Sequence, residues 1–305
     1  MTVLLVLFML FLVVQAFYSI VRVHKSRIGI VRVESWEANQ PKRSTASFLL
    51  CGVQNSTDEL FARHMDLIPG NKYIFDYGQV GFLGFKMEFR DIAKQIEITI
   101  ENTNYEEIHF YGVSLGAKIW TEVIRRLPKE IRQKTTFYII NGALQPDDVK
   151  NPAKTLGKPL EVLSWLWPVD LLGTICMKIG HKFGAKKDMK EFCKTDEDRS
   201  YKRSIDVVAN YKMTFGVFAG QVRFLNQRIN TDEKIFVHRI VNLQSKYDSE
   251  IHIKSQAESA RAIFDWDNFD EMVLRTSHST LYLGLWSDVF SGEIDFELVN
   301  KLSCE

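Results

Sequence analysis

Five residues near the middle of the chain, Gly112 to Gly116, read Gly-Val-Ser-Leu-Gly. They follow an apolar, strand-like segment that starts at Glu107, and a helix predicted from Ala117 to Leu127 follows them at once. A strand-to-helix turn this tight leaves no room for side chains beside the serine, which accounts for the two glycines. The pattern predicts that Ser114 stands at the carboxyl end of a strand, facing the N-terminus of a helix. The alternative is an ordinary strand-turn-helix junction.

Segments of strand-like composition alternate with segments of helical periodicity along the rest of the chain. Further strands are predicted over residues 29–36, 46–52, 72–78, 135–142 and 234–244, and further helices over 88–101 and 255–264. Strands that alternate with helices favour a mostly parallel sheet covered on both faces. The expected fold class is therefore α/β, with a mostly parallel central sheet flanked by helices.

Residues 145–233 interrupt this alternation, and we call them the insertion. They are punctuated by proline and carry Trp165 and Trp167, and we expect a helical lid packed on the main sheet. Residues 160–180 are apolar enough to line an acyl pocket or to enter a bilayer interface. Four lysines then stand where anionic head groups would meet them: Lys182, Lys186, Lys187 and Lys190. The alternative is a helix packed on the core, with solvated lysines.

The chain begins with an uncharged apolar segment, Val3 to Val21. As a helix rising about 1.5 Å per residue, it would span a hydrocarbon core of about 30 Å. We therefore expect residues 1–28 to form a single-pass membrane anchor and residues 29–305 to form the body. The alternative is a secretory signal peptide, because Val14-Gln15-Ala16 offers the small residues that a signal peptidase accepts.

Basic residues follow the apolar segment and none precedes it. They are Arg22, His24, Lys25, Arg27 and Arg32. The positive-inside rule therefore favours the cytoplasmic side for the body. A cleaved signal peptide would place it on the other side.

The composition excludes several classes of function. With 39 basic and 38 acidic residues the net charge is +1, which gives no electrostatic reason to expect a nucleic-acid partner. Neither GxGxxG nor GxxxxGK occurs, which disfavours a nucleotide site. The cysteines are Cys51, Cys176, Cys193 and Cys304, and without CxxC spacing they indicate neither a zinc site nor a redox pair. Buried free thiols are expected, with a Cys176–Cys193 disulfide as the alternative in an oxidising compartment. No metal or organic cofactor is expected.

With Ser114 between a predicted strand and a predicted helix, the chain resembles the α/β-hydrolase family over nearly all of its length beyond the anchor. The resemblance implies a nucleophilic serine, followed along the chain by an acid and then by a histidine base. Asp248 follows the last predicted strand, where the family carries its acid, and His278 lies in a polar loop thirty residues later. The competing acids are Asp147, Asp265 and Asp267.

The resemblance also implies two backbone donors for a tetrahedral oxyanion. The amide of Leu115, directly after the serine, is the first. The family takes the second from a loop after an earlier buried strand, which frequently begins His-Gly. This chain has Cys51-Gly52-Val53-Gln54, so the glycine matches and the histidine does not. The amide of Val53 or Gln54 is the expected donor, since main chain serves whatever the side chain.

These features predict a serine hydrolase with the triad Ser114, Asp248 and His278, acting through an acyl-enzyme. The apolar insertion and the anchor favour a small-molecule ester or lipid, cleaved at a carboxylic ester or thioester bond. Peptidase or amidase activity is the alternative among enzymes. The alternative from another class is a catalytically silent hydrolase fold that serves as a membrane-tethered binding module.

Overall fold

The computed structural model describes residues 2–27, 44–52, 68–75, 88–150, 155–192, 214–246, 248 and 250–274. Within the two longest helices, side-chain positions are described for residues 3–23 and up to Gly180. The predicted strand over residues 29–36 lies outside the described residues, as do Val53, Gln54 and His278.

Six strands form one sheet in the described part of the chain, and every neighbouring pair is parallel. In spatial order they are β2 (Asn71–Phe75), β1 (Thr45–Leu50), β3 (Glu107–Val113), β4 (Thr135–Ile140), β5 (Ile235–Ser245) and β6 (Phe264–Leu274). All six carboxyl ends therefore meet at one edge of the sheet. The predicted α/β class with a parallel sheet is confirmed.

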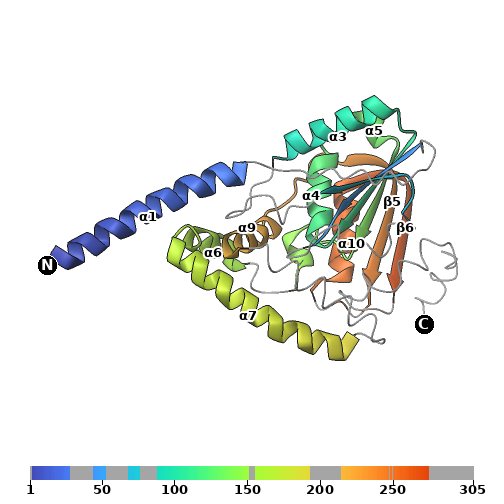
Figure 1. The fold of residues 1–305 in the computed structure, drawn as a ribbon. Coiled ribbons are helices and arrows are strands. Elements are labelled where there is room, and N and C mark those ends of the chain that lie inside the picture. The colour runs from blue at the N-terminus through green and yellow to red at the C-terminus, as the bar shows by residue number, and fades with distance from the viewer. Residues whose placement is uncertain are drawn as a thin grey trace.

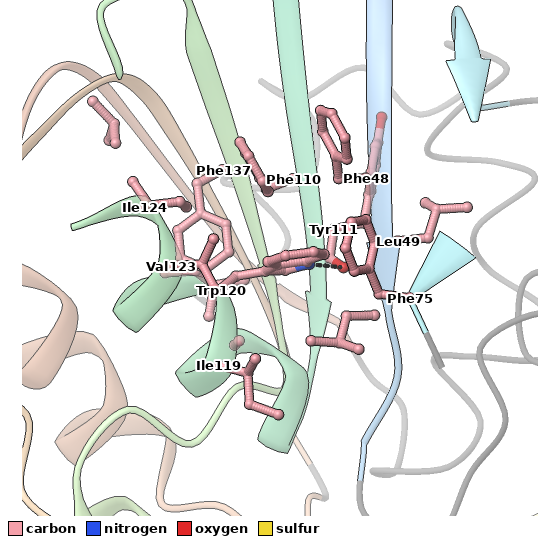
Figure 2. Packing of buried hydrophobic residues seen from close by; sticks show 14 of the residues in the cluster. Phe48, Leu49, Phe75, Phe110, Tyr111, Ile119, Trp120, Val123, Ile124 and Phe137 are labelled. Atoms are coloured by element: carbon pink, nitrogen blue, oxygen red, sulfur yellow. Dashed lines mark hydrogen bonds between the residues drawn. The ribbon is translucent and has the colours of Figure 1, made fainter. Parts of the chain in front are cut away.

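A row of aromatic residues crosses the sheet on one face. The register pairs Tyr73 with Phe48, Phe48 with Phe110, and Phe110 with Phe137. Phe48 stacks on both Tyr73 and Phe110 with ring centroids 5.0 Å apart. Trp120 packs edge-on against Phe110 and donates its indole N–H to the carbonyl of Tyr111 at 3.0 Å (Figure 2). This row fixes the register of the strands that lead to the serine.

The helices that connect the strands all carry buried residues, and in one of them nearly every residue is buried. They are α3 (Phe89–Thr103), α4 (Leu115–Ile124), α5 (Lys129–Arg132) and α10 (Ile253–Ile263). In α3 the buried residues Ile92, Ile96 and Ile100 recur at helical spacing, which is the pattern that predicted this helix. Helices α3 and α4 pack side by side, and α4 contacts β3 and β1 (Figure 1).

Between β4 and β5 the insertion contains three described α-helices, α6 (Gly157–Leu163), α7 (Trp167–Phe192) and α9 (Phe215–Leu225). They pack together on the same side of the sheet as α1 (Thr2–Arg27), which projects away from the body (Figure 1). Within α1, residues Val3–Val23 are long and apolar enough to cross a membrane, with a mean hydropathy of 2.6.

Three sequence expectations need correction. Strand β6 was not predicted, and Asp265 and Asp267, which were named only as competing acids, lie among its first residues. It is one of the two edge strands of the described sheet, and charged residues are typical of such edges. Helix α4 begins at Leu115, two residues earlier than predicted. Cys51 is buried and forms no disulfide, as expected, whereas Cys176 forms no disulfide but is exposed.

The aromatic row predicts the effect of a core truncation. Phe110→Ala is expected to lower the free energy of unfolding by about 3–5 kcal/mol, because it leaves a cavity between Phe48 and Trp120. Urea denaturation in detergent micelles measures the change. Ile98→Ala on α3 is the matched control, because Ile98 is 46% exposed and its loss should cost less than about 1 kcal/mol. Equal losses would contradict this account of the core.

Candidate active site

Ser114 stands between β3 and α4 in a strained backbone conformation. Its φ is 50° and its ψ is −115°, a region that L-amino acids with side chains rarely adopt. Such a residue costs roughly 1–3 kcal/mol and persists only where its surroundings enforce it. The sequence pattern predicted a tight turn here, and the positive φ is its physical form.

Glycines make this turn possible by allowing close backbone approach. A Cβ on Gly112 would lie 2.6 Å from the Cα of Ala117, and one on Gly116 would lie 2.5 Å from the carbonyl oxygen of Leu50. Both distances are far below any real contact, so α4 can lie against β3 and β1 only with glycine at these positions. The same holds for Gly52, where a Cβ would lie 2.9 Å from the Cβ of Ser114. The end of β1 therefore touches the serine directly.

Hydrogen bonds anchor the serine backbone to the neighbouring strand. Its amide donates to the carbonyl of Ile140 at 2.9 Å, and its carbonyl accepts from the amides of Ala117 and Ala143, each at 3.2 Å. Ser114 itself is half-buried among otherwise buried neighbours. The backbone is thus fixed while the side chain stays within reach of solvent.

Leu115 is the first residue of α4, so its amide has no acceptor within the helix. The amide lies at the positive end of the helix dipole, directly after the serine. This is the arrangement expected of an oxyanion donor. Val53 and Gln54 lie outside the described residues, but Gly52, the residue that precedes them, is in contact with Ser114.

Asp248 lies just beyond the carboxyl end of β5 and is only 3% exposed. Its amide donates to the carbonyl of Ser245 at 3.1 Å, and its Oδ1 accepts from the amides of Glu250 and Ile251 at 2.7 and 2.8 Å. Lys150 donates to its backbone carbonyl. The carboxylate is therefore held rigidly by its own loop, at the edge of the sheet where Ser114 also lies.

The competing acids are placed elsewhere. Asp265 and Asp267 lie in the first residues of β6, and the parallel register sets Asp265 beside Phe236 at the amino edge of the sheet. Asp267 there pairs with His238 at 3.1 Å, and both side chains are about half exposed. Asp147 is exposed and pairs with Arg228 at 2.9 Å. Of the four candidates, Asp248 alone is both buried and at the serine's edge.

Asn141, which sequence reasoning did not single out, ties the ends of β4 and β5 together. Its φ is 43°, a conformation that asparagine tolerates better than most residues. The side-chain oxygen accepts from the amide of Ser245 at 2.8 Å, while the side-chain nitrogen donates to the Ser245 hydroxyl at 2.9 Å. Since Ser114 is bound to the end of β4 and Asp248 to the end of β5, Asn141 links the two. An asparagine before glycine at a strand end was the available signal.

Asp148 is a second buried residue with several hydrogen-bond partners that sequence reasoning missed. Its Oδ2 accepts from the amides of Leu144 and Gln145 at 3.0 and 2.8 Å, and its Oδ1 accepts from the hydroxyls of Ser255 and Ser259 at 2.8 and 2.7 Å. The Asp148 side chain that accepts these four hydrogen bonds is fully buried. Asp148 thereby joins the loop after β4 to helix α10, and it acts as a structural group beside the Asp248 loop.

Lys118, one turn after Ser114 on α4, is buried with an exposed fraction of 1%. Its ammonium group donates to the carbonyl of Leu225 at 2.9 Å and to that of Gln227, so it caps the end of α9. Burial lowers the pKa of Lys118 to about 7, against a smaller opposing effect of Asp148 and Glu122. The helix that carries the serine is thus bound to the insertion.

The described residues bring Ser114, Leu115, Gly52 and Asp248 to one edge of the sheet. His278 lies outside them, so the base of the expected triad is not placed. Among the residues described, no group of three His, Cys, Asp or Glu side chains is arranged to hold a metal ion.

The burial of Lys118 predicts a pH-dependent stability. The unfolded chain binds this proton with the ordinary pKa of 10.5, whereas the folded chain releases it at about 7. Between these values the unfolded state binds more protons, so the wild-type free energy of unfolding should rise with pH by at most about 1.4 kcal/mol per unit. Lys118→Met removes this term.

Urea denaturation across this pH window compares wild type with Lys118→Met and with the exposed control Lys129→Met. The stability difference between wild type and Lys118→Met should change steadily with pH, while the Lys129→Met difference stays constant. Parallel curves for all three proteins would show that burial does not lower the pKa of Lys118 in the folded state.

Comparison with known proteins gives matches among solved structures. No protein-family model and no curated protein matches the chain. The enol-lactonase from Burkholderia xenovorans is 11% identical with a TM-score of 0.56, over 90% of this chain and 96% of that chain. MenH from S. aureus is 13% identical with a TM-score of 0.54, over 86% and 96%. The carboxylesterase CesB from Bacillus subtilis is 12% identical with a TM-score of 0.51, over 95% and 96%. At these identities the likeness establishes the fold.

Proposed function

Because the chain has the α/β-hydrolase fold, we propose that it is a serine hydrolase that cleaves carboxylic ester or thioester bonds of a lipophilic substrate. The observation that carries the proposal is the positive φ of Ser114 at the junction of β3 and α4. A strained serine at a helix N-terminus, at the carboxyl edge of a parallel sheet, suits a nucleophile whose oxyanion is bound by backbone amides.

In the proposed reaction the Ser114 hydroxyl attacks the substrate carbonyl and passes its proton to His278. The amides of Leu115 and of Val53 or Gln54 bind the oxyanion that forms. His278 then protonates the leaving alcohol or thiol as the carbonyl re-forms, which leaves an ester on Ser114. Water, deprotonated by His278, hydrolyses this acyl-enzyme and releases the acid. Asp248 orients the imidazole and stabilises its cation.

Chain geometry supports His278 as the base. The register sets Leu274, the last residue of β6, beside Ser245, the last residue of β5. Asp248 follows Ser245 by three residues, and His278 follows Leu274 by four. Four residues reach at most about 14 Å. This short tether supports the proposal that His278 acts together with Asp248.

The assignment of parts follows from the same proposal. Residues 1–28 act as a single-pass membrane anchor, and residues 29–305 form the hydrolase domain, with residues 145–233 as its lid. Support for the anchor comes from α1, whose apolar span is exposed along most of its length. The basic residues after the span favour the cytoplasmic side for the domain. Detection of the intact N-terminus on the mature protein would exclude the signal-peptide alternative.

Labelling with a fluorophosphonate probe tests the nucleophile. Wild type in detergent micelles is expected to label at one site, because an activated serine attacks phosphorus as it attacks a carbonyl. Ser114→Ala should abolish labelling, and His278→Ala should slow it by roughly a hundredfold or more. Gel fluorescence over time gives the rates.

Matched variants test the other roles. Asp248→Asn should slow labelling by a comparable factor, whereas Asp267→Asn at the opposite edge and His252→Ala near the acid should label as wild type does. Equal slowing by both aspartate variants would refute the assignment of the acid. A folded wild type that stays unlabelled would favour the catalytically silent binding module. Labelled protein that cleaves amides faster than matched esters would favour the alternative of peptidase or amidase activity.

A further inference from the structure

Exposed apolar surface is confined to two regions of the described chain. Apart from Ile98, every large hydrophobic residue in the exposed class lies on α1 or within residues 156–179 of the insertion. The second group includes Val162 and Leu163 on α6, Trp165 in the following turn, and Leu171 and Leu172 on α7, with exposed fractions of 38–62%. Soluble proteins rarely expose contiguous apolar patches of this kind without a partner.

On α7 the exposed apolar residues form one stripe. Leu171, Ile175 and Ile179 follow each other at intervals of four, and Leu172 lies beside them. The stripe faces away from α9, because Asp170, Gly173 and Thr174 are the residues of α7 that contact the start of α9. Gly173 lies against the ring of Phe215, so close that a Cβ would come within 2.5 Å of it. The inner side of α7 is thus packed, whereas its outer side is apolar and is not covered by the residues that the structure describes.

Helix α1 is fastened to the turn between α6 and α7 by Gln15. The side-chain nitrogen of Gln15 donates to the carbonyl of Trp165 at 2.7 Å, and its oxygen accepts from the amide of Trp167 at 3.1 Å. Trp167 opens α7, so its amide has no acceptor within the helix. Both backbone groups of the turn are therefore satisfied by one side chain, which explains a polar residue inside an otherwise apolar segment.

Tyr18 and Arg22 extend the contact along the same face of α1. The Tyr18 hydroxyl donates to the carbonyl of Ser164 at 3.1 Å. Arg22 donates to the Ser164 hydroxyl at 2.9 Å and to the Ser164 carbonyl, and its guanidinium lies 4.3 Å from the ring centroid of Trp165. Arg22 is only 1% exposed. Gln15, Tyr18 and Arg22, spaced three and four residues apart, form a contact that we call the latch.

The latch sets the depth of the turn relative to α1. Gln15 lies eight residues before Val23, the end of the apolar span, which is about 12 Å along the helix axis. One leaflet contributes about 15 Å of hydrocarbon. When α1 spans a bilayer, the turn that Gln15 binds therefore lies within the near leaflet, while Arg22 lies at its surface. Backbone polar groups at that depth have no water to bind, and Gln15 supplies their partner.

We propose that α6 and α7 form a second membrane element, docked on α1 by the latch, which buries its apolar stripe in the near leaflet of a lipid bilayer. The proposal rests on the membrane anchor of the proposed function. It deepens that function, because the insertion also binds the serine's helix through Lys118 and α9.

Depth-dependent quenching of a fluorescent label tests the proposal. The full-length protein is reconstituted in phosphatidylcholine vesicles with or without lipids that carry a nitroxide on the acyl chain. Cys176, Cys193 and Cys304 are replaced by serine, and buried Cys51 is kept. A nitrobenzoxadiazole label is then attached to one new cysteine at a time. Leu172→Cys reports the stripe and Leu10→Cys reports the anchor.

Glu130→Cys on α5 serves as the control for the body, because this residue is exposed and remote in the fold from both apolar regions (Figure 1). The expected result is strong quenching at residues 172 and 10 and none at residue 130. Quenching at residue 10 without quenching at residue 172 would overturn the inference while the anchor stands. The absence of quenching at residue 10 would overturn both. Since the readout needs no turnover, failure of the serine chemistry leaves this result unaffected.

Gln15→Leu tests the latch in the same vesicles. The substitution makes α1 more apolar and keeps the anchor, but it removes both hydrogen bonds to the turn. The ratio of protein with α6 and α7 docked on α1 to protein with them undocked should therefore fall by about thirtyfold. Quenching at residue 172 should fall, while quenching at residue 10 is unchanged. Val14→Leu is the matched control and should behave as wild type. Full quenching at residue 172 in Gln15→Leu would show that the latch does not hold α6 and α7 in place.

Discussion

The backbone of Ser114, with φ at 50°, holds a conformation that is unfavourable by roughly 1–3 kcal/mol, and the surrounding structure is arranged to enforce it. Helix α4 must start directly at the end of β3, and it can do so only because Gly112 and Gly116 let main chain approach main chain. The parallel sheet supplies the opposing force, through the bond from the serine amide to Ile140 and the aromatic packing beneath α4. A relaxed φ would withdraw the hydroxyl from the edge of the sheet.

Two series of contacts connect the turn that carries Ser114 to the rest of the structure. One runs along the edge of the sheet, where Asn141 joins the end of β4 to Ser245 and the Asp248 loop is closed by its own amides. The other runs through Lys118 into α9, and from there through α6 and α7 to the latch on α1. The position of the serine is thereby coupled to the position of the apolar N-terminal helix. In a bilayer this coupling would set a fixed height for the site above the lipid.

The sequence predicted the features that depend on local chain properties. Helical periodicity found α3, and the tight-turn glycines found Ser114, since both are determined by neighbours along the chain. Strand β6 was missed because its acidic residues hide the pattern, and its stability comes from pairing with β5. Asn141 and Lys118 were missed for a related reason: their partners lie about a hundred residues away, at Ser245 and Leu225. The sequence does not distinguish a buried lysine from an exposed one, and Lys118 becomes buried only when the insertion packs on α4. His278 stays a prediction.

The central claim is that the Ser114 hydroxyl becomes acylated during turnover. Its most direct test is to stop the reaction of a medium-chain p-nitrophenyl ester with acid within the first turnover and to map the adduct by mass spectrometry. Trypsin would release the peptide Gln95–Lys118, in which Ser114 is the single serine. The account predicts an acyl group on that serine, formed together with about one equivalent of p-nitrophenol. Ester cleavage with an unmodified peptide, or with the acyl group on another residue, would contradict it.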